Sequence, residues 1–187
     1  MKKCFLILVF LMGLSGLTQG VYADSPAPSL PQRFDSANGQ YYVEMVSDDT
    51  EGFGYGSGTG TAYRMDDKGT AEELWSVNFY SSQAVLTNDG RHLITLGPLA
   101  SDMTNLAIAF YQDGKEMKRY QIKELIRDES KLEPTASHFL WLSDHPNYAA
   151  GLSEDEKEYT LNLIDGSVYV FDVVSGQILQ EKHPPIG

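Results

Sequence analysis

Residues 106–120 read LAIAFYQDGKEMKRY, two runs of strand-forming residues on either side of Gln112-Asp113-Gly114. An Asp-Gly pair supplies the positive φ angles that a tight turn between antiparallel strands requires. The stretch therefore predicts a β-hairpin, and the same arrangement recurs along the chain. Further hairpins are predicted from residues 60–65 with 71–79, 83–87 with 92–96 and 160–163 with 168–173, and from a last turn at Ser175-Gly176. The sequence thus predicts an all-β fold of antiparallel hairpins.

One segment departs from the hairpin pattern. Residues 121–132 place Ile122, Leu125 and Ile126 at helical spacing among charged residues, and Pro134 follows as a stop signal. We predict one short amphipathic helix in this segment.

The hairpins also form a loose internal repeat. Units that start at Tyr41, Gln83 and Thr135 give a period of about 40 to 50 residues, which is the range of propeller blades. A closed propeller usually has at least four blades, and only about three units fit here. The sequence therefore leaves two architectures open, a partial propeller and a β-sandwich-like stack of antiparallel sheets.

Two stretches carry a resemblance. Residues 84–93, AVLTNDGRHL, look like the opening of a blade with WD/YVTN-like repeats, and residues 168–179, VYVFDVVSGQIL, look like the closing hairpin of one. The order of features over residues 83–180, from this hairpin through the Asp113-Gly114 turn and the helix to Ser137 and Trp141, resembles an uncharacterised family of small exported bacterial proteins. The resemblance implies a propeller-like fold and brings no established activity with it.

The amino-terminal region is typical of an exported protein. Residues 1–23 combine Lys2 and Lys3 with an apolar run and small residues before a cleavage point near Ala23, which predicts a signal peptide. Residues 24–40 are rich in proline and small polar residues, and we predict a disordered lead-in there. The expected organisation is then a single β-rich domain over residues 41–183 and a tail over 184–187, located in the periplasm or outside the cell.

Cysteine usage and charge exclude several classes of function. The one cysteine, Cys4, lies in the predicted signal peptide, so the mature chain has no disulfide and no cysteine nucleophile. The full chain has a formal charge of −12, and loss of Lys2 and Lys3 would leave 12 basic against 26 acidic residues, a charge of −14. Nucleic acid would be repelled by such a chain. After the signal we expect no transmembrane segment, because no apolar run is long enough.

The acidic runs at residues 48–51 and 154–158 are candidate calcium ligands. They lack the ligand alternation and the glycine of an EF-hand loop, so we interpret them mainly as solvated surface. The histidines show no metal-ligand spacing either. We therefore expect neither a metal nor a cofactor.

Two segments hold the candidate binding residues. The alternating glycines of residues 52–60 carry Phe53 and Tyr55, and indicate either an aromatic loop that closes over a ligand or a strand with one bare, closely packed face. Residues 137–148 carry Trp141, Asp144, His145 and Tyr148. Here we expect a strand over residues 139–142, buried on both faces, followed by a loop.

No catalytic motif accompanies these residues, since the Gly-x-Ser-x-Gly elbow is absent and Asp144 and His145 would point apart in an extended chain. The leading hypothesis is a non-catalytic exported module that binds a protein, one with a basic surface for example, or another envelope component. A periplasmic inhibitor or immunity-type protein is one version of it. The alternative is a hydrolase with a cleft around Asp144 and His145, and a third hypothesis is self-association through open sheet edges.

Overall fold

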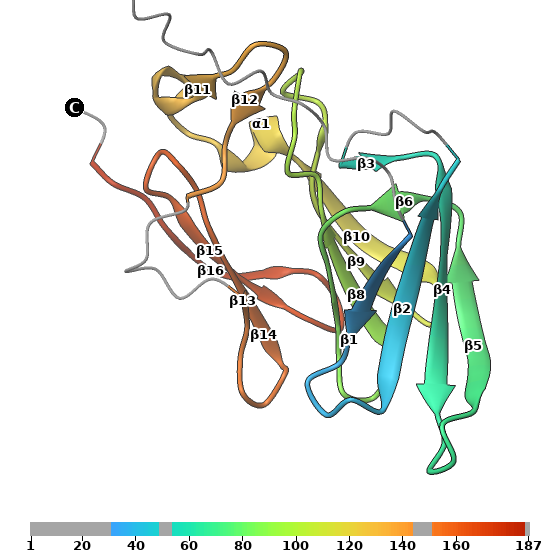
Figure 1. Ribbon diagram of the computed structural model, residues 1–187. Coiled ribbons are helices and arrows are strands. Elements are labelled where there is room, and N and C mark those ends of the chain that lie inside the picture. The colour runs from blue at the N-terminus through green and yellow to red at the C-terminus, as the bar shows by residue number, and fades with distance from the viewer. Residues whose placement is uncertain (1–30, 49–53, 144–150, 186–187) are drawn as a thin grey trace, which may run out of the picture.

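The computed structural model describes residues 31–48, 54–143 and 151–185, and three four-stranded antiparallel sheets dominate them (Figure 1). In each sheet the spatial order of the strands follows their order in the sequence. The first sheet comprises β1 (Gln32–Asp35), β2 (Tyr41–Ser47), β4 (Gly58–Met65) and β5 (Ala71–Val77). The second comprises β7 (Ala84–Leu86), β8 (His92–Leu96), β9 (Leu106–Gln112) and β10 (Lys115–Gln121). The third comprises β13 (Gly151–Leu152), β14 (Glu158–Asn162), β15 (Val168–Asp172) and β16 (Ile178–Lys182).

Two smaller strand pairs lie at one end of these sheets (Figure 1). They are β3 (Tyr55–Gly56) with β6 (Tyr80–Ser81), and β11 (Glu133–Pro134) with β12 (Phe139–Leu140). The all-β prediction is confirmed, and so are the predicted hairpins. In the hairpin over residues 106–120, Asp113 and Gly114 take φ values of 49° and 78°, and these two left-handed residues join β9 to β10.

The three sheets correspond to the three predicted units, with corrected boundaries. The first sheet begins at Gln32, so residues 32–40 are not part of a disordered lead-in. Phe34 of β1 lies opposite Val43 and packs against the core, while the Ser36 hydroxyl accepts a hydrogen bond from the Tyr41 backbone N–H. The prolines before this strand indicate disorder, and Phe34 is the one large apolar residue in the strand itself. The third sheet begins at Gly151 rather than near Thr135, because residues 133–140 form the separate β11–β12 pair.

The predicted helix is shorter than expected. Helix α1 spans Ile122–Leu125, and a 3-10 turn over Glu129–Lys131 follows it. Between them the backbone N–H groups of Arg127 and Asp128 donate to the Asp165 carboxylate at 2.7 and 3.2 Å. These bonds replace the bonds that would continue the helix, and they attach the segment to a turn of the third sheet.

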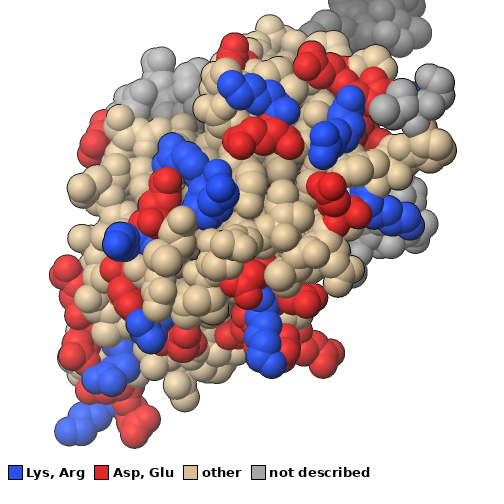
Figure 2. All heavy atoms as spheres, turned by 180° about the vertical axis from the view of Figure 1, so that it is seen from behind, with Lys and Arg blue, Asp and Glu red and all other residues tan. Residues whose placement is uncertain are grey.

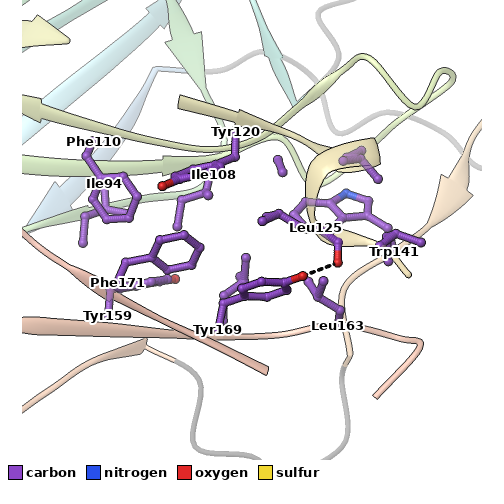
Figure 3. Packing of buried hydrophobic residues seen from close by; sticks show 14 of the residues in the cluster. Ile94, Ile108, Phe110, Tyr120, Leu125, Trp141, Tyr159, Leu163, Tyr169 and Phe171 are labelled. Carbon is purple, nitrogen blue, oxygen red and sulfur yellow. Dashed lines mark hydrogen bonds between the residues drawn. The ribbon is translucent and has the colours of Figure 1, made fainter. Parts of the chain in front are cut away.

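The core consists of two clusters, one on each face of the second sheet. Strand β9 is buried on both faces: Ala109 and Tyr111 belong to the cluster shared with the first sheet, and Ile108 and Phe110 to the cluster shared with the third. Figure 3 shows Phe110 and Tyr120 facing Phe171 of β15, with ring centroids 5.3 Å from Phe171 in both cases. The second sheet is thus the middle layer of a three-sheet stack. This position explains why β9 is an almost continuous run of apolar residues.

The outer faces of the two end sheets combine polar and apolar side chains in the described residues. On the first sheet Tyr42 stacks on Tyr63 at 5.0 Å, and the Arg33 guanidinium covers the Tyr42 ring at 3.7 Å. Val46 of the same sheet is exposed. On the third sheet β16 carries exposed Gln180, Glu181 and Lys182 next to exposed Leu179.

Buried tyrosines make the stability of the fold sensitive to alkaline pH. Burial raises the pKa of Tyr159 to about 12, against about 10 in an unfolded chain. Since the unfolded state loses this proton first, the stabilisation is fully present below about pH 10 and is lost as the pH rises toward 12. We expect the free energy of unfolding to fall over this window, by about 2 to 3 kcal/mol for Tyr159 alone.

Denaturant titrations between pH 8 and 12 measure this effect. Tyr159→Phe is expected to flatten the pH dependence, because the substitution removes the phenol that titrates. Equal slopes for the wild type and Tyr159→Phe would contradict the assignment.

Candidate functional site

Of the six predicted binding residues, two lie in the described part of the chain. Phe53, Asp144, His145 and Tyr148 lie outside the described residues. Tyr55 and Trp141 are described, and the structure gives them different positions.

Trp141 is a core residue. Its side chain is fully buried, and its indole N–H donates to the Gly97 carbonyl at 3.0 Å. Figure 3 places the ring beside Leu125. The predicted strand with two buried faces is wrong, because β12 ends at Leu140 and the side chain of Leu140 is 41% exposed.

Tyr55 lies at the rim of a groove of about 520 Å³. The groove is formed by Tyr55 of β3, by the loops around Gly97 and Asn105 at the ends of β8 and β9, by Arg119 of β10, and by residues 137 and 138. Long-range pairing brings these segments together, since β3 hydrogen-bonds to β6 and β9 lies between β8 and β10. We take this Tyr55–Arg119 groove as the candidate functional site.

The glycines around Tyr55 have a packing role. A Cβ on Gly60 would lie 2.5 Å from the Met45 sulfur, and one on Gly54 would lie 2.8 Å from the Ser82 hydroxyl. The second sequence interpretation, a strand with a bare and closely packed face, is therefore supported for these positions. The glycines hold Tyr55 at the groove by letting neighbouring elements approach closely.

Arg119 is held at the same rim by Glu116 and Tyr55. Its Nε and Nη2 donate to the Glu116 carboxylate, with Nη2 at 2.6 Å, and Nη2 lies 3.5 Å from the Tyr55 hydroxyl. The hydrogen bonds that Arg119 donates to Glu116 raise the pKa of the guanidinium above its ordinary value. Burial, and then Tyr55, raise the pKa of the adjacent Tyr111, so this phenol stays neutral at physiological pH. The rim is thus formed by a guanidinium that is paired with a carboxylate and lies next to the Tyr55 hydroxyl.

Aromatic packing fixes the orientation of Tyr55. Its ring stacks on Phe79 with centroids 5.4 Å apart, and Phe79 packs on Tyr111 at 4.9 Å. Tyr111 belongs to the core, so the aromatic series joins the rim to the interior. A preorganised ring of this kind loses little entropy when a ligand stacks on it.

The floor of the groove offers further donors. The Asn105 Oδ1 accepts hydrogen bonds from the backbone N–H groups of Ser101 and Asp102, at 2.9 and 3.0 Å. This bonding leaves the amide nitrogen of Asn105 to donate elsewhere. Leu99 and Leu106 supply apolar surface between the polar groups.

The groove also contains a serine next to a histidine. The Ser137 hydroxyl lies 2.8 Å from His138 Nδ1. The described residues that line the groove include no carboxylate. The arrangement can bind a ligand through hydrogen-bond donors, a guanidinium and an aromatic ring.

A larger cleft of about 970 Å³ lies between the segment after α1 and the end of the third sheet. Several of its polar groups contact one another. Asp165 accepts from three backbone N–H groups, including that of Ser167 at 2.9 Å, and His183 Nδ1 contacts the Ser167 hydroxyl at 3.1 Å. The His183 Nε2 is buried and makes no hydrogen bond in the described structure. The contacts of Asp165 attach the segment after α1 to the third sheet.

Sequence reasoning identified Tyr55 and missed Arg119 and Asn105. The sequence around Arg119 shows the neighbouring Glu116 but not the contact with Tyr55, because Tyr55 is distant in the sequence.

Residues 31–48, 54–143 and 151–185 contain no cluster of three or more side chains that could hold a metal ion. In the same ranges no helix is long and apolar enough to cross a membrane.

No protein-family model matches the sequence, and no curated protein matches it. Solved structures that match this chain in part include BamB from Moraxella catarrhalis, at 12% identity over 81% of this chain and 35% of that chain, with a TM-score of 0.44. A periplasmic gluconolactonase from Pseudomonas aeruginosa is 16% identical over 86% of this chain and 58% of that chain, with a TM-score of 0.32. Sqt1 from Saccharomyces cerevisiae is 13% identical over 86% of this chain and 36% of that chain, with a TM-score of 0.40. The chain therefore spans between about a third and three fifths of the length of these proteins.

Proposed function

We propose that this protein is an exported β-repeat module that binds a protein partner through the Tyr55–Arg119 groove and has no catalytic activity. The observation that carries the proposal is the composition of the groove, which pairs Tyr55 and Arg119 with amide and hydroxyl donors and lacks a carboxylate among the described residues. Tyrosine and arginine are the residue types that dominate the energetics of protein interfaces. Donors of this kind suit the carbonyl oxygens of a peptide segment presented by the partner.

The proposal includes the organisation expected from the sequence. Residues 1–23 would be removed as a signal peptide, and the mature chain would act in the periplasm or outside the cell. With a formal charge of −12 for the full chain, a partner with a basic surface would be attracted over a distance. A periplasmic inhibitor or immunity-type role is the specific version that we propose for testing.

The test starts from partner capture. The mature chain, residues 24–187, is used to capture proteins from envelope and culture extracts at low and moderate salt, and the dissociation constant of any partner is measured. We expect Arg119→Gln to weaken binding about tenfold, because the groove loses its guanidinium while the sheet remains intact. The matched control is Arg64→Gln, which breaks the exposed Arg64–Glu72 pair on the first sheet and should leave binding unchanged.

If Arg119→Gln and Arg64→Gln bound the partner with equal affinity, the groove would not be the binding site. If the wild type showed turnover in a hydrolase screen and His145→Ala abolished it, the enzyme hypothesis would be favoured over the proposal. Light scattering on the mature chain tests self-association separately: a monomer would count against the third hypothesis, and a stable dimer would favour it.

A further inference from the structure

The turns between the first two strands of the three large sheets are joined to one another by hydrogen bonds. Asn38 of the β1–β2 turn donates its backbone N–H to Asn88 Oδ1 at 2.6 Å, and its side-chain Nδ2 donates to the Asn88 carbonyl at 2.9 Å. Asn88 lies in the β7–β8 turn, and its own backbone N–H donates to the Glu156 carboxylate of the β13–β14 turn at 2.8 Å. We call the contact between Asn38 and Asn88 the turn joint, because it attaches the first sheet to the second.

The residue after Asn38 makes the turn joint chemically reactive. Gly39 follows Asn38, and no other asparagine of the chain precedes a glycine. The backbone nitrogen that follows an asparagine can attack Cγ of its side-chain amide, and a glycine has no Cβ to obstruct the approach. The Gly39 nitrogen would lose its proton and bond to Asn38 Cγ, while the Cγ–Nδ2 bond breaks and ammonia leaves. Water then opens the succinimide ring to aspartate or isoaspartate, so the reaction needs no oxidant and no cofactor.

Hydrogen bonds oppose this reaction while the turn joint is closed. The Gly39 N–H, whose nitrogen is the attacking atom, donates to the Ser36 carbonyl at 2.9 Å. Asn38 Oδ1 accepts from the Gln40 backbone N–H at 2.9 Å, and Asn88 holds Nδ2, the leaving group. Attack makes Cγ tetrahedral and moves both atoms out of the amide plane, so these bonds have to lengthen or break. Asn38 and Gly39 are both exposed, and an exposed turn is a place where a fold opens locally.

We propose that Asn38 is a deamidation site, which reacts when the first sheet separates locally from the second at the turn joint. The modification makes this separation permanent. Both products carry a carboxylate in place of the amide, so they cannot donate to the Asn88 carbonyl. Isoaspartate also lengthens the backbone of the turn by one carbon. The site is separate from the Tyr55–Arg119 groove and does not depend on the proposed function.

The rate of deamidation tests whether the turn joint controls the reaction. The mature chain, residues 24–187, is incubated at mildly alkaline pH, and peptide mass spectrometry follows the conversion of Asn38 to aspartate and isoaspartate. We expect the reaction to be at least about tenfold slower than in a synthetic peptide of residues 34–42, because the folded turn has to open first. Asn88→Ala should accelerate it about fivefold, the factor that corresponds to the loss of one hydrogen bond.

Asn78→Ala is the matched control for the rate. Asn78 is exposed between β5 and β6, and its side chain makes no hydrogen bond to the described residues. This substitution removes an asparagine side chain away from the turn joint. It should therefore leave the rate at Asn38 unchanged.

The consequence for the fold is tested with Asn38→Asp, which has the side chain of one product. We expect its melting temperature to be about 2 to 4 °C below that of the wild type, the shift that corresponds to about one lost hydrogen bond in a domain of this size. Asn78→Asp makes the same change in charge away from the turn joint. Figure 2 shows acidic and basic side chains dispersed over the face that it draws, so one further carboxylate on the surface should change the melting temperature little.

Three results would overturn the proposal. Equal rates in the folded chain and in the peptide would show that the turn does not protect Asn38. Equal rates in Asn88→Ala and Asn78→Ala would exclude control by the turn joint. Equal melting temperatures for Asn38→Asp and Asn78→Asp would show that the modified protein keeps its sheets joined. None of these measurements requires a partner, so this proposal and the proposed function can fail independently.

Discussion

Trp141→Ala is expected to lower the free energy of unfolding by about 3 to 5 kcal/mol, the cost of removing a large aromatic side chain from a packed core. The side chain is fully buried in the cluster shared by the second and third sheets. Its indole N–H also satisfies the Gly97 carbonyl, which would be left without this donor. A loss of this size is a large part of the total stability of a small domain. Chemical denaturation followed by circular dichroism measures it.

Trp141→Phe separates the two contributions. Phenylalanine retains much of the apolar volume but cannot donate to Gly97, so we expect an intermediate loss of about 1 to 3 kcal/mol. If Trp141→Ala cost less than 1 kcal/mol, the residue would not be part of the core. Trp141 would then return to the list of residues that can contact a ligand.

Gly176→Ala is the second substitution with a large expected effect. Gly176 has a φ of 68°, and a Cβ at this position would lie 2.6 Å from the Lys118 Cβ and 2.8 Å from the Phe110 ring. The left-handed conformation costs about 1 to 2 kcal/mol for alanine, and overpacking against β9 and β10 adds about 1 to 3 kcal/mol. We expect a total loss of about 2 to 5 kcal/mol in denaturant titrations, because the turn of the third sheet could no longer approach the second.

Gly69→Ala is the matched control for this substitution. Gly69 has a φ of 79° in the β4–β5 turn, and no atom lies within 4 Å of a Cβ placed there. The control therefore has the conformational cost alone, about 1 to 2 kcal/mol. Similar losses for the two variants would show that contact between the sheets at Gly176 contributes nothing.

Local sequence signals predicted most of the fold. The Asp-Gly and Ser-Gly turns are confirmed because their backbone angles depend on a few adjacent residues, as at Asp113-Gly114. Strand β1 was missed since its position depends on Phe34 reaching the core, which the surrounding polar residues do not indicate. The helix was predicted too long because Asp165, distant in the sequence, accepts the backbone N–H groups of Arg127 and Asp128.

The candidate site could be predicted only in part. Tyr55 was identified from the unusual glycine pattern around it, whereas Arg119 and Asn105 gain their role from strand pairing that a single sequence does not reveal. Trp141 was a candidate because it lies close in the sequence to His138 and His145. Its position depends on the packing of α1 and the third sheet, and this packing buries it.

Each large sheet is built from one contiguous segment of the chain, and the core clusters join the first sheet to the second and the second to the third. The amino-terminal part of the chain is synthesised first, so the four strands of the first sheet can pair before those of the third sheet are available. The inner face of the first sheet would stay exposed only until β7 to β10 of the second sheet pack against it. Stability should then accumulate sheet by sheet, which suits a chain that folds while its carboxyl end is still being delivered.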